Sequence, residues 1–303
     1  MMSSSVTFET PWERISAAAP RMIRRRVARP FVVKYWTCGS ISISAVSGFM
    51  TTLTTPLSGR AALVTGSTGG LGVGIAHALA HAGAFVVVTG RDKARGDAVV
   101  ADIRSAGGAA AFASADLSGE HEEVRRLASC ATALAGGRVD ILVNNAAMLL
   151  MPTPTADVSV ELLRDAFSVN VFAPFFLTGV IAPQMARDGG GAVVNIGSIA
   201  GLRGASGSAV YSANKSAIHS LTTSWADEYG PAGVRVNAVA PGPIATERQR
   251  EFADYLAPAL ARIPSRRMST VTEVSDAVVF LAGPAGANIH GAILSVDGGW
   301  SAV

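Results

Sequence analysis

A tyrosine and a lysine stand four residues apart in the segment YSANK, at Tyr211 and Lys215, in a chain that has only four tyrosines. Residues i and i+4 of a helix share one face, so these side chains would be neighbours if the segment is helical. A cation beside a tyrosine favours the phenolate and lowers a pKa that is ordinarily about 10. A tyrosine tuned in this way can give a proton to a carbonyl oxygen or take one from an alcohol.

Two further polar residues bear on this pair, because a tyrosine and a lysine alone are a common feature of exposed helix surfaces. Ser198 ends the apolar run 191–198, thirteen residues before the tyrosine. Asn170 lies in the apolar stretch FSVNVFAPFF, where a buried amide needs a hydrogen-bonding partner. With these two residues, the pair becomes a candidate catalytic set.

A glycine-rich segment, TGSTGGLGVG at 65–74, follows the first apolar run and opens a helical pattern. Gly66, Gly70 and Gly72 would let the turn close and let the backbone approach a pyrophosphate. The helix that follows supplies N–H donors and the positive end of its dipole. No GK[ST] follows, so the segment is not a Walker loop. Its context predicts a dinucleotide site.

The second apolar run ends in TGRD, where enzymes that prefer NAD usually place an acid for the ribose 2′-hydroxyl. Gly90 stands at the expected position of that acid, and Arg91 follows it. An arginine can make a bidentate contact to a 2′-phosphate. Asp92 is an acid nearby, but it can cap the next helix. The pattern favours NADP(H), with NAD(H) as the alternative.

The elements that would position these residues alternate along the chain. Near-continuous Val, Ile and Ala runs, typical of strands buried on both faces of a parallel sheet, span 60–66, 84–90, 109–116, 140–146, 191–198, 234–242 and 291–299. Predicted helices lie between them at about 70–82, 93–106, 119–135, 157–187, 209–229 and 273–283. This order predicts one doubly wound α/β domain, with about seven parallel strands and its ligands at their carboxyl ends.

From about residue 58 to residue 300, the chain resembles the short-chain dehydrogenase/reductase family. The resemblance rests on motifs in the family's order: TGSTGGLG (65–72), ADL (115–117), NNAA (144–147), Asn170, Ser198, YSANK (211–215), PGPIAT (241–246) and VDGGW (296–300). It implies a Rossmann-type fold and hydride transfer between a nicotinamide cofactor and a carbonyl or secondary alcohol. NNAA replaces the commoner NNAG, which leaves the catalytic set intact.

The resemblance also implies a role for each catalytic candidate. Tyr211 would donate a proton to the carbonyl oxygen, and Ser198 would hydrogen-bond that oxygen. Lys215 would bind the nicotinamide ribose and lower the pKa of the tyrosine. Asn170 would hold a water that connects the lysine to solvent.

Cofactor contacts are implied in the same way. Asp116 would contact the adenine, Asn144 the ribose region and Thr246 the nicotinamide carboxamide. The full expected cofactor-binding set is Gly66, Ser67, Thr68, Gly70, Leu71, Gly72, Arg91, Asp116, Leu117, Asn144, Tyr211, Lys215, Pro241, Ile244 and Thr246. No metal is expected, because His77 and His81 stand at i and i+4 without a third ligand.

The substrate is less closely defined. Overall resemblance favours a 3-oxoacyl-thioester reductase, with a dehydrogenase or reductase of sugars, polyols or other small ketones as the alternative. A cofactor-sensing binding protein is the non-enzyme alternative, disfavoured because a sensor needs no proton donor. MLLMPTP (148–154) either lines a substrate pocket or packs inward. The long segment 243–270 would form a mobile lid, whose arginines (Arg248, Arg250, Arg266 and Arg267) either meet an acidic substrate or face solvent.

Residues 1–56 differ in composition from the rest of the chain. They carry seven basic and two acidic residues, whereas 57–303 carries 18 basic and 20 acidic ones. The basic pI therefore says nothing about nucleic-acid binding by the main body. The uncharged stretch 35–59 is too rich in Ser and Thr for a membrane span. We interpret residues 1–56 as a disordered extension, as an extension that results from a start codon placed too early, or as a targeting peptide. The catalytic domain would then span 57–303. We expect a chain that begins at Met50 to keep full activity.

Cys38 and Cys130 form no CxxC pair, which favours a reduced, cytoplasmic protein. The expected partners are a small-molecule carbonyl or alcohol and other copies of the chain, without nucleic acid or membrane. The predicted helix 157–187 carries VNVFAPFFLTGVIAPQM, which is apolar around most of its circumference. Such a helix is buried on more than one side, so we expect a homotetramer, or at least a homodimer.

Overall fold

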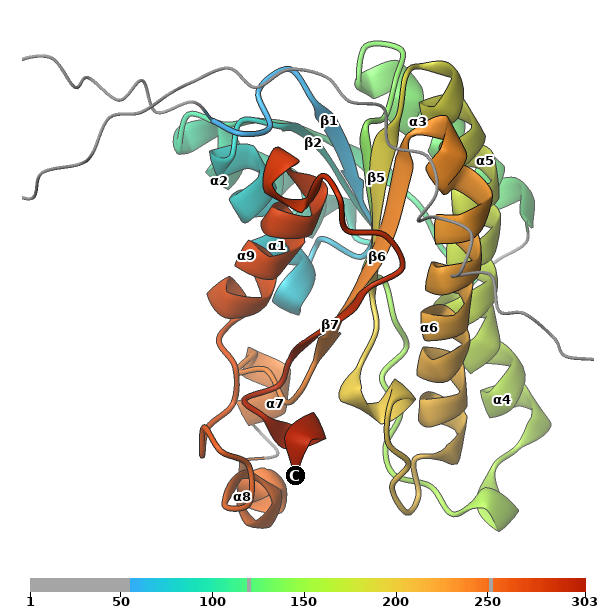
Figure 1. Ribbon diagram of the computed structural model, residues 1–303, viewed down its shortest axis with the longest axis vertical. Coiled ribbons are helices and arrows are strands. Elements are labelled where there is room, and N and C mark those ends of the chain that lie inside the picture. The colour runs from blue at the N-terminus through green and yellow to red at the C-terminus, as the bar shows by residue number, and fades with distance from the viewer. Residues whose placement is uncertain (1–54, 119–120, 251–252) are drawn as a thin grey trace, which may run out of the picture. The chain divides into compact units, whose positions relative to one another are not determined.

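Seven short strands form one parallel sheet in the computed structural model, which describes residues 55–118, 121–250 and 253–303 (Figure 1). The strands are β1 (Ala61–Val64), β2 (Phe85–Gly90), β3 (Ala109–Ser114), β4 (Ile141–Asn144), β5 (Gly191–Ile196), β6 (Val234–Pro241) and β7 (Ile293–Val296). Their spatial order is β3-β2-β1-β4-β5-β6-β7, and every pairing is parallel. The order reverses between β1 and β4, which is where such sheets bind their ligands.

Helices cover both faces of this sheet (Figure 1). On one face, α1 (Gly70–His81), α2 (Lys93–Ser105) and α9 (Val271–Ala282) bury their apolar side chains against the strands. On the other face, α3 (His121–Leu134), α5 (Ala173–Arg187) and α6 (Ala209–Tyr229) do the same. The central strands are therefore buried on both faces, which is why they read as continuous apolar runs.

Local capping signals fix where several helices begin. Asp92 accepts a hydrogen bond from the backbone N–H of Arg95 at 3.1 Å and caps α2, as the sequence predicted. Thr270 and Glu273 form a reciprocal capping box at the start of α9. Glu273 also pairs with Arg267 at 2.6 Å, so one of the arginines of segment 243–270 contacts a protein carboxylate. The side chains of Arg248 and Arg250 lie outside the described residues.

The sequence placed all seven strands and most helix boundaries within a few residues. The predicted helix 157–187 is the exception, because it is built in three parts. It comprises α4 (Val160–Phe167), a π-helical turn (Ser168–Phe172) and α5. Within the described residues, the run Val160–Arg187 alone is long and apolar enough to cross a membrane. Half of its most apolar window is buried in the protein, as in a core helix.

After β6 the chain forms two short helices, α7 (Glu247–Arg250) and α8 (Ala253–Leu260), before α9. They occupy the segment predicted as a lid and lie at the end of the molecule to which β6 points (Figure 1). The interpretation of residues 1–56 falls almost wholly on 1–54, which lie outside the described residues, so it stays a prediction.

Candidate active site

The catalytic candidates lie near the carboxyl ends of β4 and β5 and on α6. Ser198 follows β5 in extended conformation and caps a short 3₁₀ turn, Ile199–Gly201. Its Oγ accepts a hydrogen bond from the backbone N–H of Ala200 at 3.1 Å. This hydrogen bond orients the hydroxyl at the carboxyl end of β5, which is where the sequence predicted it.

Tyr211 and Lys215 lie on the same side of α6, as their spacing predicted. The lysine Nζ is 5.7 Å from the centroid of the tyrosine ring and donates to the carbonyl of Ile196 at 2.8 Å. That carbonyl belongs to the last residue of β5, two positions before Ser198. The lysine therefore ties the catalytic helix to the strand that carries the serine.

Burial shifts the pKa values of both titratable groups. It raises the pKa of Tyr211 above its ordinary value, and the nearby hydroxyl of Ser198 opposes that rise. The direction is opposite to the sequence prediction of a tyrosine with a lowered pKa. The reason is that removal from water disfavours the phenolate more than the serine favours it. The protonated phenol is therefore the resting form, which suits a proton donor.

Burial also lowers the pKa of Lys215 to about 8. The side chain is only 3% exposed, and a buried ammonium loses the hydration that it has in water. Its hydrogen bond to Ile196 satisfies one of three donors. The ammonium thus has donors left for further polar groups at the site.

Asn170 is 2% exposed and lies in the π-helical turn. Its Oδ1 accepts from the backbone N–H of Met148 at 2.7 Å, and its Nδ2 donates to the carbonyl of Met148 at 3.1 Å. Nδ2 also donates to Oδ1 of Asn214 at 2.9 Å, on α6 between the tyrosine and the lysine. The hydrogen-bonding partners that the sequence predicted for the Asn170 amide are thus the loop after β4 and helix α6.

The glycine-rich loop leaves no room for side chains at two of the three predicted glycines, Gly66 and Gly72. A Cβ on Gly72 would be 2.3 Å from the carbonyl oxygen of Gly66, and one on Gly66 would be 2.8 Å from Cα of Ala146. Gly66 and Gly70 also adopt positive φ angles of 62° and 53°. Leu71 packs against the core beneath the loop. The loop therefore presents bare backbone at the start of α1, which is the form of a pyrophosphate cradle.

Two side chains hold this loop in place. Ser67 is fully buried; its Oγ donates to the carbonyl of Val64 at 2.7 Å and accepts from the backbone N–H of Thr89 at 2.9 Å. Asn145 donates to the carbonyls of Thr65 and Gly66 at 2.8 and 3.1 Å. The serine, predicted as a cofactor contact, has its hydroxyl engaged with backbone. The role of Asn145 was not singled out from the sequence, although it lies in the quoted NNAA motif.

The Asn144 side chain points into the protein rather than toward the loop. Its Nδ2 donates to Asn195 Oδ1 at 2.8 Å and to Thr178 Oγ1 at 3.2 Å. Asn195 in turn donates to Thr222 on α6 at 2.9 Å. This buried chain of hydrogen bonds joins β4, β5, α5 and α6, so Asn144 ties helices to the sheet. The cofactor contact of Asn144 stays a prediction.

At the end of β2, Thr68 occupies the space in front of Gly90. A Cβ on the glycine would be 2.5 Å from the threonine Oγ1. Hydrogen bonds from the hydroxyl and the backbone N–H of Ser118 lower the pKa of the Asp116 carboxyl, and the charge of Arg91 adds a smaller lowering. Arg91 itself is exposed. Glycine therefore stands where an acid would be expected in an enzyme specific for NAD, and an exposed cation follows it directly.

The remaining predicted cofactor residues lie beside the same strand ends. Pro241 is buried at the end of β6, and Leu117 follows β3 and packs against the core. Ile244 forms a parallel bridge with Ser269, closing the base of the segment that holds α7 and α8. Thr246 approaches the glycine-rich loop, since a Cβ on Gly70 would be 3.9 Å from its methyl group.

A small pocket borders Tyr211 and is lined mostly by apolar side chains. The loop after β4 contributes Leu150 and Met151 to the lining. Val158 follows the 3₁₀ turn Thr155–Asp157, and Leu162 lies on α4. The remaining lining comes from Pro152, Thr153, Gly207, Ser208 and Val210. The segment MLLMPTP was predicted either to line a substrate pocket or to pack inward, and residues 150–153 of it line this pocket.

The site thus combines a buried cation, a protonated phenol and a serine hydroxyl beside a bare glycine-rich loop. This arrangement can donate a proton to a carbonyl oxygen while a dinucleotide lies across the strand ends. Within the described residues, no cluster of three or more His, Cys, Asp or Glu side chains could hold a metal ion.

Comparison with known proteins supports this picture. Residues 60–256 match the short chain dehydrogenase family. Cyclopentanol dehydrogenase from Comamonas sp. (strain NCIMB 9872) is 38% identical over 251 residues, covering 80% of this chain and 97% of that protein.

Two solved structures are similar along most of the chain. One, provisionally assigned as a betaketoacyl-ACP reductase, is 42% identical with a TM-score of 0.73, covering 82% of this chain and 100% of its own. The other, provisionally assigned as an NAD(P)-dependent gluconate 5-dehydrogenase from Beutenbergia cavernae, holds NADP; it is 38% identical with a TM-score of 0.76 and the same coverage. The chain therefore belongs to the short-chain dehydrogenase/reductase family of oxidoreductases.

Proposed function

We propose that the protein is an NADP(H)-dependent oxidoreductase that interconverts a ketone and a secondary alcohol. The observation that carries the proposal is the placement of Tyr211 and buried Lys215 beside Ser198, at the strand ends that the glycine-rich loop faces. Gly66 and Gly72 keep the turn before α1 tightly closed, because a Cβ at either position would clash with neighbouring protein atoms. The backbone N–H groups at the start of α1 are the donors that would bind a dinucleotide pyrophosphate. A cofactor-sensing protein would need no such proton donor.

In the proposed reduction, the bound cofactor supplies the hydride for the carbonyl carbon. The phenol of Tyr211 donates its proton to the carbonyl oxygen, and the hydroxyl of Ser198 hydrogen-bonds the same oxygen. Lys215 favours the phenolate that this transfer leaves, because its charge is close and poorly screened in a buried site. Asn170 holds the loop after β4 against α6 and so fixes the wall of the pocket.

The proposed preference for NADP(H) rests on the end of β2. No acid stands at Gly90, and Thr68 fills the space that an acidic side chain there would need. Arg91 is exposed next to this position and can pair with a 2′-phosphate.

Arg91→Ala is expected to lower kcat/KM for NADPH by about 10- to 100-fold and to leave kcat/KM for NADH nearly unchanged. Hydrogen bonds to charged groups contribute roughly 1.5–3 kcal/mol, which sets this range. Arg95→Ala is a matched control, because Arg95 is also an exposed cation near β2 but pairs with Asp92 at 3.1 Å. A wild-type preference for NADH, or an unchanged ratio in the Arg91 variant, would exclude Arg91 as the selector.

For the substrate, we propose a 3-oxoacyl thioester, on the basis of the overall likeness to the structure assigned as a betaketoacyl-ACP reductase. Small cyclic ketones and alcohols are the second candidate. They are favoured by the apolar lining beside Tyr211 and by the likeness to cyclopentanol dehydrogenase. The same lining makes sugars and polyols poorer candidates, because it offers few partners for their hydroxyls.

Initial rates with NADPH against a panel of carbonyl compounds test these alternatives. The panel should hold an acetoacetyl thioester, cyclopentanone, a steroid ketone and a keto sugar acid. The reverse reaction, oxidation of each corresponding alcohol with NADP⁺, should be assayed as well. Turnover of the thioester above all others supports the first candidate, and a preference for cyclopentanone supports the second. Cofactor binding without turnover of any compound would favour a sensing role.

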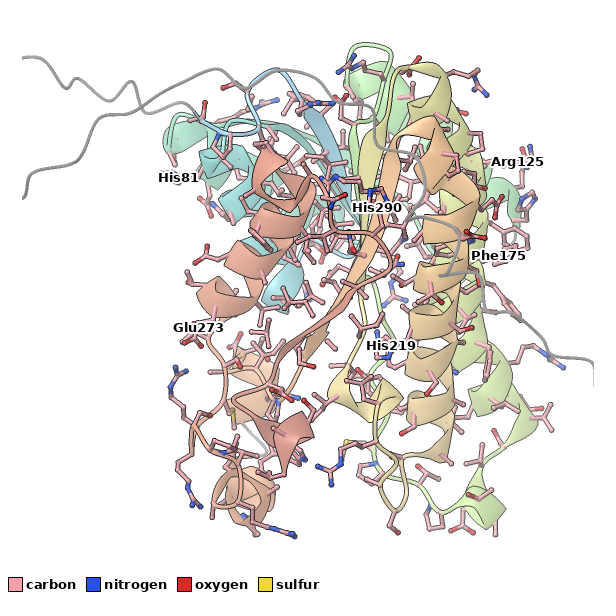
Figure 2. The ribbon with its side chains drawn as sticks, viewed as in Figure 1. His81, Arg125, Phe175, His219, Glu273 and His290 are labelled. Carbon is pink, nitrogen blue, oxygen red and sulfur yellow. The ribbon has the colours of Figure 1, made fainter. Side chains whose placement is uncertain are left out.

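We further propose that the protein assembles as a homotetramer, or at least a homodimer, through α4, α5 and α6. Phe175 packs on Trp225 of α6 at 6.0 Å between ring centroids and is still 47% exposed (Figure 2). Four more large apolar side chains on α4, the π-helical turn and α5 are exposed: Val160, Leu163, Phe172 and Phe176. A second copy would cover this face.

Light scattering at low micromolar concentration is expected to give at least twice the mass of one chain. Phe175→Glu should shift that mass toward the monomer, because an unpaired charge would be buried in the interface. Glu161→Gln on exposed α4 is a control that leaves the apolar side chains in place. A monomer mass that persists as the concentration rises would exclude the interface. The cytoplasmic location stays a prediction.

A further inference from the structure

His219 lies on α6, one turn after Lys215, and is only 7% exposed. Neither ring nitrogen makes a well-aligned hydrogen bond among the described residues, and the backbone of Gly201 is close enough to act on the pKa of the ring. Figure 2 shows the side chain on α6 near the level of the strand ends. Burying an imidazole without well-aligned hydrogen bonds costs folding free energy, so a contact through which the ring acts is expected.

Two glycines make room for this ring. A Cβ on Gly197 would be 2.2 Å from the imidazole Nε2 and 2.8 Å from Cδ2. A Cβ on Gly201 would be 2.7 Å from the imidazole Cε1. The ring is therefore in close contact with the backbone immediately before Ser198 and three residues after it.

The contact bears directly on the serine. Ser198 begins the turn that ends at Gly201, and its hydroxyl is held by the N–H of Ala200 within that turn. The backbone N–H of Gly197 donates to Val239 at 2.8 Å, which fixes the strand side of the same segment. The imidazole supports the other side.

We propose that His219 is a positioning residue: its ring packs against Gly197 and Gly201 and holds Ser198 at the place from which its hydroxyl reaches the Tyr211 hydroxyl and the substrate oxygen. This rests on the proposed function, because it assigns the support of that same site. Burial and then the neighbouring Lys215 lower the pKa of His219, while the backbone of Gly201 opposes that fall, so the site favours the neutral ring beside the lysine.

The geometry allows a size-exchange test. Gly197→Ala places a methyl group mainly against the ring, since its next contact is an ordinary 3.4 Å to the carbonyl of Val239. It should displace the serine and lower kcat on the order of 10²-fold, as misplacement by about 1 Å can. His219→Ala should also lower kcat, because the turn loses its support. The double variant Gly197→Ala/His219→Ala should recover about 10-fold over Gly197→Ala alone.

Gly201→Ala is the matched control for this exchange. Its Cβ would meet the imidazole, but also the backbone C and O of Lys215 at 2.7 and 2.8 Å. Removing the ring cannot relieve a contact with backbone. Gly201→Ala/His219→Ala should therefore stay as inactive as Gly201→Ala.

Three readouts separate positioning from general destabilisation. The cofactor dissociation constant should stay within about 2-fold in every soluble variant, because the glycine-rich loop is untouched. The kcat should fall more than the substrate KM rises. The primary deuterium isotope effect on kcat, measured with 4-deuterated NADPH, should increase because hydride transfer becomes more rate-limiting.

The outcomes are decisive in each case. Recovery in the Gly197 double variant and none in the Gly201 double variant supports the proposal. Losses that simply multiply in both double variants would overturn it, as would His219→Ala with wild-type kcat. If the wild-type enzyme turns over no carbonyl compound, the proposed function fails. The thermal midpoints of the same variants then test the packing contact by itself. Adding His219→Ala should raise the midpoint of Gly197→Ala but not the midpoint of Gly201→Ala.

Discussion

Tyr211→Phe is expected to fold, to bind the cofactor and to lose roughly 10²–10⁴-fold in kcat, the usual contribution of a positioned general acid. The phenol stays protonated in the free protein because burial raises its pKa. Only its hydroxyl can donate to the substrate oxygen, and phenylalanine keeps the ring while removing that group. Steady-state rates together with a cofactor titration would measure the two effects separately.

Tyr229→Phe is the control for this substitution. Tyr229 lies at the other end of α6, where burial and Glu228 raise its pKa to about 12. Its hydroxyl lies away from the site, so kcat should be unchanged. A Tyr211→Phe enzyme with kcat near the wild-type value would remove the tyrosine from the proposed mechanism.

Lys215→Met is expected to abolish most turnover and also to change how stability depends on pH. The lysine pKa falls from 10.5 to about 8 in the folded protein because the ammonium is buried. Between these values the unfolded chain binds more protons than the folded one, so stability rises with pH. The lowered pKa costs the wild type roughly 3 kcal/mol of folding stability below pH 8, and most of this cost disappears by pH 10.

The measurement is urea unfolding of the cofactor-free protein at pH 7 and pH 10. The wild-type free energy of unfolding should rise by roughly 2 to 3 kcal/mol relative to that of Lys215→Met over this range. Lys93→Met, which removes an exposed lysine paired with Asp97, should follow the wild type. Parallel pH dependences for Lys215→Met and the wild type would show that the lysine pKa is not lowered.

The fold was predictable because the sequence repeats one physical signal. Seven apolar runs alternate with helical patterns, and a parallel sheet covered on both faces is the arrangement that buries such runs. The helix boundaries were also readable where capping was explicit, as at Asp92. Residues 157–187 were less readable, because an apolar pattern does not distinguish a continuous α-helix from one with a π-helical turn.

The site was predictable in outline and less so in its electrostatics. The spacing of Tyr211 and Lys215 correctly placed the two side chains on one side of α6. The spacing could not show that desolvation affects the pKa of Tyr211 more than the charge of Lys215 does. The burial of Tyr211 depends on residues that are far away in the sequence. The same limit hid His219, whose importance comes from its contact with Gly197 across the fold rather than from any local pattern.

The π-helical turn at Ser168–Phe172 has a consequence for the chain lengths that this region tolerates. A π turn holds one more residue than an α turn, and each α-helical residue advances the side chains by about 100°. A single-residue deletion at Val169 would favour regular helix and turn Asn170 away from Met148 and Asn214. The segment should therefore accept apolar substitutions more readily than a change of length, and homologues with active sites of this form should differ here in residue type rather than in residue number.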